Sequence, residues 1–121
     1  MGSMSRQKGK RGEREAAAAI QAALKIDARR GQQFSGSEES PDVVTSLDKI
    51  HIEVKRTESL RMWDALSQAE SDSGSKLPVV LHRKNKKRWV AICYLDDLLE
   101  VSSEIYSKCV LTEINTENKA Q

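Results

Sequence analysis

The sequence predicts an α/β domain with a small mixed β-sheet flanked by helices, in the order α-β-β-β-α-β-β-α. Residues 50–55 alternate strictly between apolar and polar side chains, which is typical of a half-buried strand. An alanine-rich segment near the start favours a helix, and two apolar stretches around a basic turn favour a hairpin. A chain of 121 residues has room for one domain with a single modest core.

The first third of the chain predicts one helix and little else. Residues 1–11 are basic and contain glycine, so we expect a flexible arm, and residues 1–3 are typical of a cloning remnant. The helix should run from about Gly12 to Ile26, because its alanines have high helix propensity and Gly31 follows its end. A short extended piece is expected near residues 32–34, before a Ser/Gly/Glu loop.

The middle of the chain predicts two strands and a helix. Pro41 biases its predecessor towards an extended backbone and opens a strand over 42–46. A turn then leads into the alternating strand 50–56. A helix over about 60–71 should end at the Ser-Gly-Ser linker of residues 73–75.

The last part of the chain predicts a hairpin and a short helix. Residues 78–82 and 89–94 are the hairpin strands, and a helix is expected near 95–101. The predicted domain therefore covers 12–101, and residues 102–121 form a polar C-terminal tail.

Composition excludes several classes of protein and site. No apolar run is long enough for a membrane span, and no basic-then-apolar leader precedes a cleavage site, so we expect a cytoplasmic protein. Cys93 and Cys109 lack CxxC spacing, which indicates two ordinary thiols rather than a zinc site. Walker, GxSxG and HExxH motifs are absent.

Charge is unevenly distributed along the chain. Residues 1–33 hold eight Lys/Arg against three acids, and 76–88 hold six Lys/Arg and no acid. Residues 89–121 reverse the sign, with six acids against two lysines. This segregation indicates a positive face for a polyanion such as nucleic acid, although solvated loops with scattered charge are the plainer interpretation of each cluster alone.

The alternating strand presents an acid and an amine on one face. Side chains two apart in a strand point the same way, so Glu53 and Lys55 project together, with α-carbons roughly 7 Å apart. Asp42 begins the preceding strand, and a tight turn between the two strands would bring its carboxylate towards Glu53. A bare E-x-K arises often by chance, and an exposed Glu–Lys pair is the competing interpretation.

Such a set suits phosphodiester hydrolysis. Two carboxylates can hold Mg²⁺, for which Mn²⁺ commonly substitutes, since Mg²⁺ prefers oxygen ligands and keeps several waters. The metal lowers the pKa of a bound water and screens the phosphate charge. A lysine can then orient or deprotonate the attacking water, or stabilise the developing charge.

A third acid is expected on the first helix. At 100° per residue, Glu13 lies within about 20° of Ile20 and of Leu24, so it shares their apolar face, whereas Glu15 points elsewhere. An acid on a core-facing stripe is costly unless it is paired or bound to a cation, which favours Glu13 as a site residue. The alternative is that Glu13 only favours the positive end of the helix.

Three stretches carry a resemblance to a known family: Lys8-Gly9-Lys10-Arg11-Gly12-Glu13-Arg14-Glu15, Pro41-Asp42-Val43-Val44 and Ile52-Glu53-Val54-Lys55. Over residues 5 to about 101 the chain resembles the small Holliday-junction resolvases of archaeal type and their phage relatives, within the PD-(D/E)xK nuclease superfamily. The resemblance implies a restriction-endonuclease-like core and paired cuts in branched DNA by a Mg²⁺- or Mn²⁺-dependent homodimer. Its catalytic centre maps onto Glu13, Asp42, Glu53 and Lys55, with the three acids as metal ligands.

Further residues are expected around this centre. Basic side chains beside the acids and on the hairpin turn are candidates for holding the DNA backbone: Lys8, Lys10, Arg11, Arg14, Arg29, Arg30, Lys84, Lys86 and Lys87. Gln68 is a candidate for approaching the site, with simple surface exposure as the alternative. His51 shares the face of Glu53, but a lone histidine is usually structural.

The sequence therefore predicts a structure-specific, metal-dependent DNA endonuclease that cleaves four-way junctions, acting as a cytoplasmic protein of cellular or phage origin. One alternative is another nuclease of the same superfamily that acts on flaps, nicks or ends. A second is a non-catalytic DNA-binding module, in which the acids only pair with lysines. A third is a structural protein whose basic turn docks an acidic partner.

Overall fold

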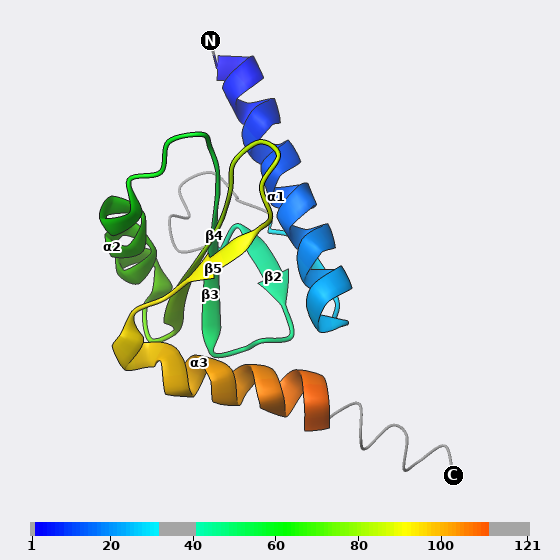
Figure 1. The fold of residues 1–121 in the computed structure, drawn as a ribbon, viewed down its shortest axis with the longest axis vertical. Coiled ribbons are helices and arrows are strands. Elements are labelled where there is room, and N and C mark those ends of the chain that lie inside the picture. The colour runs from blue at the N-terminus through cyan, green and yellow to red at the C-terminus, as the bar shows by residue number, and fades with distance from the viewer. Residues whose placement is uncertain (1, 32–40, 112–121) are drawn as a thin grey trace.

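The fold is an α/β domain built on one five-stranded mixed sheet, as predicted (Figure 1). The computed structural model describes residues 2–31 and 41–111, with side chains from Gly9 onwards in the first helix. The strands, which neighbour one another in chain order, are β1 (Ala28–Arg30), β2 (Val43–Thr45), β3 (Ile50–Arg56), β4 (Leu77–Arg83) and β5 (Val90–Ile92). The helices are α1 (Gly2–Leu24), α2 (Met62–Ser73) and α3 (Leu98–Ile105), with a 3-10 turn over Leu95–Asp97 and a π-helical segment over Tyr106–Leu111.

The pairing of the strands makes the sheet mixed and puts β3 at its centre. β3 runs parallel to β4, and every other neighbouring pair is antiparallel. The parallel pair needs a crossover, and α2 supplies it. Gly74 caps α2 at a φ of 60°, a backbone conformation that suits glycine, and the chain then turns back into β4.

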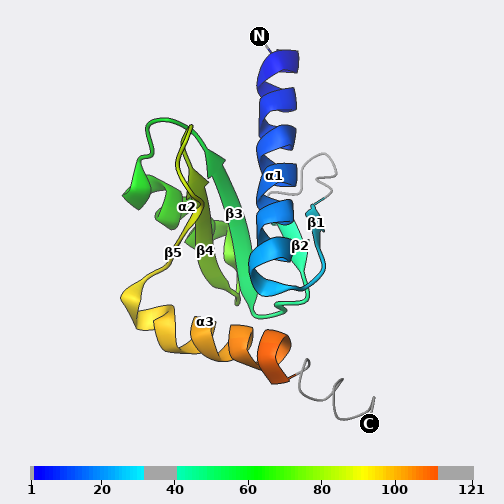
Figure 2. The same ribbon diagram turned by 45° about the vertical axis from the view of Figure 1, so that its right-hand side comes forward.

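The helices cover both faces of the sheet (Figure 2). The small side chains of Ala16 and Ala17 let α1 pack closely on one face, where Ile50 and Ile52 of β3 meet it. α3 adds Val101 to the same core. On the opposite face α2 packs against β4 through a second cluster of buried side chains: Ala65, Leu66, Ala69 and Val80. Because β3 lies between these layers, both of its faces are covered along its first half.

The ends of several elements differ from the prediction. α1 begins at Gly2 rather than near Gly12, so residues of the predicted flexible arm are helical, and it ends at Leu24, before Lys25 at a φ of 57°. The first strand is β1, whereas the extended piece predicted near 32–34 lies outside the described residues. α2 is shifted two residues towards the C-terminus of its predicted range, 60–71.

The C-terminal helix continues well past the predicted domain end at Val101. Buried Glu104 accepts a hydrogen bond from the backbone N–H of Lys49 at 2.8 Å, and Ile105 packs on the α1-side core. These contacts fasten the segment to the turn before β3, so the described part of the predicted tail packs against the domain. No helix in the described part of the chain is both long and apolar enough to cross a membrane.

Candidate active site

The carboxyl groups of Asp42 and Glu53 meet on the α2 side of the sheet. β2 pairs with β3 so that Val43 lies opposite Ile52, and one further step along this antiparallel register brings Asp42 opposite Glu53. The backbone fixes Asp42 twice, since its N–H donates to the Ile52 carbonyl at 3.0 Å and its Oδ2 accepts from the Val54 N–H at 2.8 Å. The two carboxyl groups are hydrogen-bonded to each other.

This proximity strongly perturbs both acids. Burial, then the negative charge of Glu53, raise the pKa of Asp42 from 3.8 to about 8. Burial alone would raise the pKa of Glu53 too, but hydrogen bonds from His51 and Asp42 and the charge of Lys55 together hold it below its ordinary value. The two groups therefore titrate as a pair that retains one proton at neutral pH. A cation placed between them would take over the role of that proton.

Glu13 on α1 interacts electrostatically with this pair and is held by an arginine. Its Oε2 accepts from Nε of Arg30 on β1 at 2.7 Å, and the side chain is 16% exposed. Burial raises the pKa of Glu13, the Arg30 contact opposes that rise, and the charge of Glu53 adds to it. Asp42 also responds to the charge of Glu13. The acid predicted from the helical face thus belongs to the same electrostatic cluster as Asp42 and Glu53.

Lys55 lies two residues beyond Glu53 on the same face of β3. Its Nζ donates to Oε1 of Gln68 on α2 at 3.2 Å, and its carbonyl oxygen accepts from Nδ1 of His82 at 2.8 Å. Gln68 is exposed, as one interpretation of the sequence expected, and it also contacts Lys55, as the other expected. The amine is thereby held near the acids while keeping access to solvent.

His51, which the sequence placed on the same face as Glu53 with a structural role, contacts Glu53 directly. Its Nε2 lies 2.8 Å from Oε1 of Glu53, and the two residues are 2% and 6% exposed. The signal was present in the sequence, because His51 and Glu53 are two apart in an alternating strand and must share a face.

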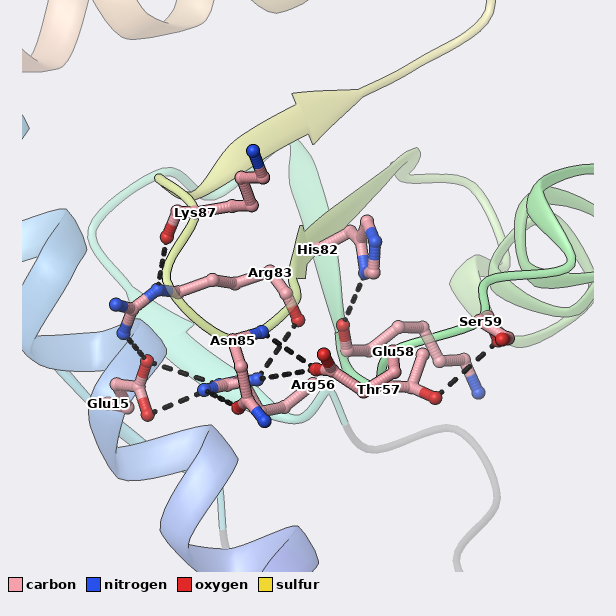
Figure 3. A network of polar contacts seen from close by, with 10 residues as sticks. Glu15, Arg56, Thr57, Glu58, Ser59, His82, Arg83, Asn85 and Lys87 are labelled. Carbon is pink, nitrogen blue, oxygen red and sulfur yellow. Dashed lines mark hydrogen bonds and ion pairs between the residues drawn. The ribbon is translucent and has the colours of Figure 1, made fainter.

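A second polar cluster lies at the C-terminal end of β3, and it explains where Glu15 points (Figure 3). Glu15 on α1 pairs with Arg56 of β3 at 3.3 Å and with Arg83 of β4. Arg56 also donates to Oδ1 of Asn85 at 2.9 Å, and the Asn85 N–H donates to Glu58 at 2.7 Å. Glu15 therefore ties the first helix to the start of the basic β4–β5 turn.

The α1 helix approaches this second cluster closely. A Cβ added at Gly12 would lie 2.8 Å from Cβ of Arg56, so the helix crosses the end of β3 where only glycine fits without a shift. Arg11 lines the hollow of about 190 Å³ that this crossing leaves beside the cluster.

The predicted DNA-binding side chains occupy three kinds of position. Arg30 is half-buried and its guanidinium forms an ion pair with Glu13. It is therefore a partner of the acidic residues rather than part of an open basic surface. The side chain of Lys8 lies outside the described residues. The others are exposed: Lys10, Arg11, Arg14, Arg29, Lys84, Lys86 and Lys87.

The acidic pair fits Mg²⁺ by the chemistry of its donors. Among the side chains that the structure describes, no three His, Cys, Asp or Glu are arranged to hold a metal together. Mg²⁺ does not need such a cage, because proteins usually hold it by one or two carboxylates while waters and substrate phosphates complete its shell. Asp42 and Glu53 supply two oxygen ligands whose mutual repulsion a divalent ion would relieve.

The two thiols are both free and half-buried, as predicted. Cys93 also lines an apolar hollow of about 250 Å³ between the sheet, α1 and α3, which holds no charged side chain. This hollow is therefore distinct from the acidic cluster.

Comparison with protein-family models found no matching family, and comparisons with curated proteins and with solved structures found no match.

Proposed function

We propose that this protein is a metal-dependent DNA endonuclease of the PD-(D/E)xK type. The observation that supports it best is the forced proximity of the Asp42 and Glu53 carboxyl groups, which raises the pKa of Asp42 to about 8. Strongly perturbed carboxyl pairs of this kind cluster at functional sites, where burial and like charges shift pKa values together. The mixed α/β fold with its five-stranded sheet is compatible with this proposal.

In this proposal Asp42 and Glu53 hold Mg²⁺ or Mn²⁺, and Glu13 contributes as a third acid, directly or through water. The bound metal supplies a water of lowered pKa and screens the phosphate charge. Lys55, aligned by Gln68, orients the attacking water or stabilises charge that develops on the phosphate. Arg30 holds the Glu13 carboxylate through an ion pair.

The proposed substrate is branched double-stranded DNA, cut at four-way junctions by a homodimer. Exposed basic side chains on α1 and on the β4–β5 turn would neutralise phosphates without reading sequence, which suits recognition of DNA shape. The Glu15 cluster supports this, because it fixes the turn to α1 and so joins two basic segments that are far apart in the sequence.

The test is cleavage of a labelled four-way junction, a flap, a nicked duplex and a plain duplex, each with Mg²⁺, Mn²⁺ or a chelator. We expect metal-dependent cutting of the junction. Asp42→Asn should abolish cutting while binding persists, because Asn keeps the acceptor for the Val54 N–H but lacks the charge. Asp48→Asn is the matched control, since this acid lies in the turn before β3 and pairs only weakly, with Lys108, at the surface.

Each other outcome selects a different function. Faster cutting of the flap than of the junction would keep the nuclease and discard the resolvase. Binding without cutting under either metal would favour the DNA-binding module, in which Glu13 and Glu15 serve only as ion-pair partners. Sedimentation that shows only monomers at micromolar concentration would count against paired cuts.

A further inference from the structure

We infer that His51 is a positioning residue that orients the Glu53 carboxylate for cation binding. This inference rests on the proposed function, because it assigns a role within the same metal site. His51 contacts neither the phosphate nor the attacking water in this scheme, and it acts only through Glu53.

The geometry defines the contact and its polarity. Nε2 of His51 lies 2.8 Å from Oε1 of Glu53, and both side chains are buried on the α2 side of β3. A carboxylate oxygen can only accept, so Nε2 carries the hydrogen and donates it. This bond uses Oε1 of Glu53 as its acceptor and leaves the second carboxylate oxygen of Glu53 for Asp42 or for a cation.

The position of His51 matters because Glu53 has a competing arrangement. Without a fixed donor, the Glu53 carboxyl can rotate about its terminal bond and turn either oxygen towards Asp42. A metal ion binds best where the ligand oxygens are already aligned. The buried His51 donor, 2.8 Å from Oε1, therefore favours one orientation of the Glu53 carboxylate.

A purely structural histidine predicts something different. In that case His51 only fills space between β3 and α2, and an apolar side chain of similar volume should preserve metal binding. The two roles are separated by whether metal affinity depends on the hydrogen bond or on the volume.

The experiment compares His51→Gln, which retains a donor near the position of Nε2, with His51→Leu, which keeps bulk without a donor. Mn²⁺ binding to each full-length protein is measured by calorimetry without DNA, and the Mg²⁺ dependence of junction cleavage is measured in parallel. We expect the Mn²⁺ Kd of His51→Leu to rise by about 10- to 100-fold, the usual effect of removing a partner of a metal ligand, while His51→Gln restores most of the affinity. If His51→Leu does not fold by circular dichroism, His51→Met replaces it, since its flexible side chain adapts to the same space.

The outcomes distinguish this inference from the proposed function. Equal Mn²⁺ affinity for the wild type and His51→Leu, with none for Asp42→Asn, overturns the role of His51 and leaves the nuclease standing. Equally weak binding by His51→Gln and His51→Leu also overturns it, because the donor then makes no difference. Absence of Mn²⁺ binding and of cleavage in the wild type removes both.

Discussion

Replacing Asp42 with Asn should make the protein more stable at alkaline pH, even though it should abolish cleavage. In the unfolded chain Asp42 loses its proton near its ordinary pKa of 3.8, whereas in the folded protein it does so at about 8. Between these two values the folded state binds more protons than the unfolded state, so this group lowers the stability as pH rises through that window. Asn has no proton to lose, and its amide can donate to Glu53 as the protonated Asp42 does.

The size of the effect follows from the shift. A pKa raised by roughly four changes the free energy of unfolding by at most about 6 kcal/mol, because a rise of one in the pKa is worth about 1.4 kcal/mol. Asp42 keeps some solvent exposure, which screens part of the repulsion, so we expect about 2–3 kcal/mol at the top of the window. The lowered pKa of Glu53 acts in the opposite sense: its stabilisation is present above its ordinary value of 4.5 and is lost as pH falls through its folded value.

The assay is urea denaturation of the wild type and Asp42→Asn at about pH 5 and about pH 9, without metal. The free energy of unfolding of Asp42→Asn should exceed that of the wild type by little at the lower pH and by more as the pH rises. The free energy of unfolding of Asp48→Asn should stay within about 0.5 kcal/mol of the wild-type value at both pH values. Mg²⁺ should stabilise the wild type and leave Asp42→Asn unchanged. If Asp42→Asn were no more stable than the wild type at about pH 9, the repulsion between Asp42 and Glu53 would not exist as described.

Three further changes test other parts of the structure. Glu15→Gln should lower the free energy of unfolding by about 1–2 kcal/mol, because Arg56 and Arg83 lose a half-buried partner, whereas Glu58→Gln at an exposed position should cost under about 0.5 kcal/mol in the same urea titration. Gly12→Ala should lower Tm in a calorimetric scan, since a clash with Arg56 of about 1–3 kcal/mol outweighs the gain in helix propensity of about 1 kcal/mol. The triple Gln variant of Lys84, Lys86 and Lys87 is tested by filter-binding titrations at several salt concentrations. The slope of log affinity against log salt concentration should become less steep by up to about three, and the cleavage rate at saturating DNA should not change.

Local patterns predicted most of the elements, and non-local contacts decided their ends. β3 has its predicted bounds, 50–56, because strict alternation leaves no other register that buries Ile50 and Ile52 together. β1 was not predicted, since three residues with two arginines carry no alternation and form a strand only by pairing with β2. α1 starts earlier than predicted, because glycines within a basic segment lower helix propensity without forbidding the helix.

The same division holds for the candidate site. The meeting of Asp42 with Glu53 was predictable because only a short turn separates their strands, and the placement of Glu13 followed from the apolar stripe of α1. Their catalytic role stays a prediction. The cluster around Glu15 was not predictable, because its partners lie 41 and 68 residues away and no periodic pattern links them.

The exposure of β3 rises along the chain, from four buried residues to three half-buried ones. Along one face the strand therefore passes from a dry end at His51, through Glu53, to a wetter end at Lys55. An ammonium at the Glu53 position would be desolvated against a histidine donor, and a carboxylate at the Lys55 position would lose its neighbouring acid. Exchanging Glu53 and Lys55 would leave the composition and net charge unchanged but would separate the two carboxyl groups. The chemistry of this strand therefore depends on the order of these two residues, with the acid at the buried position and the amine at the more exposed one.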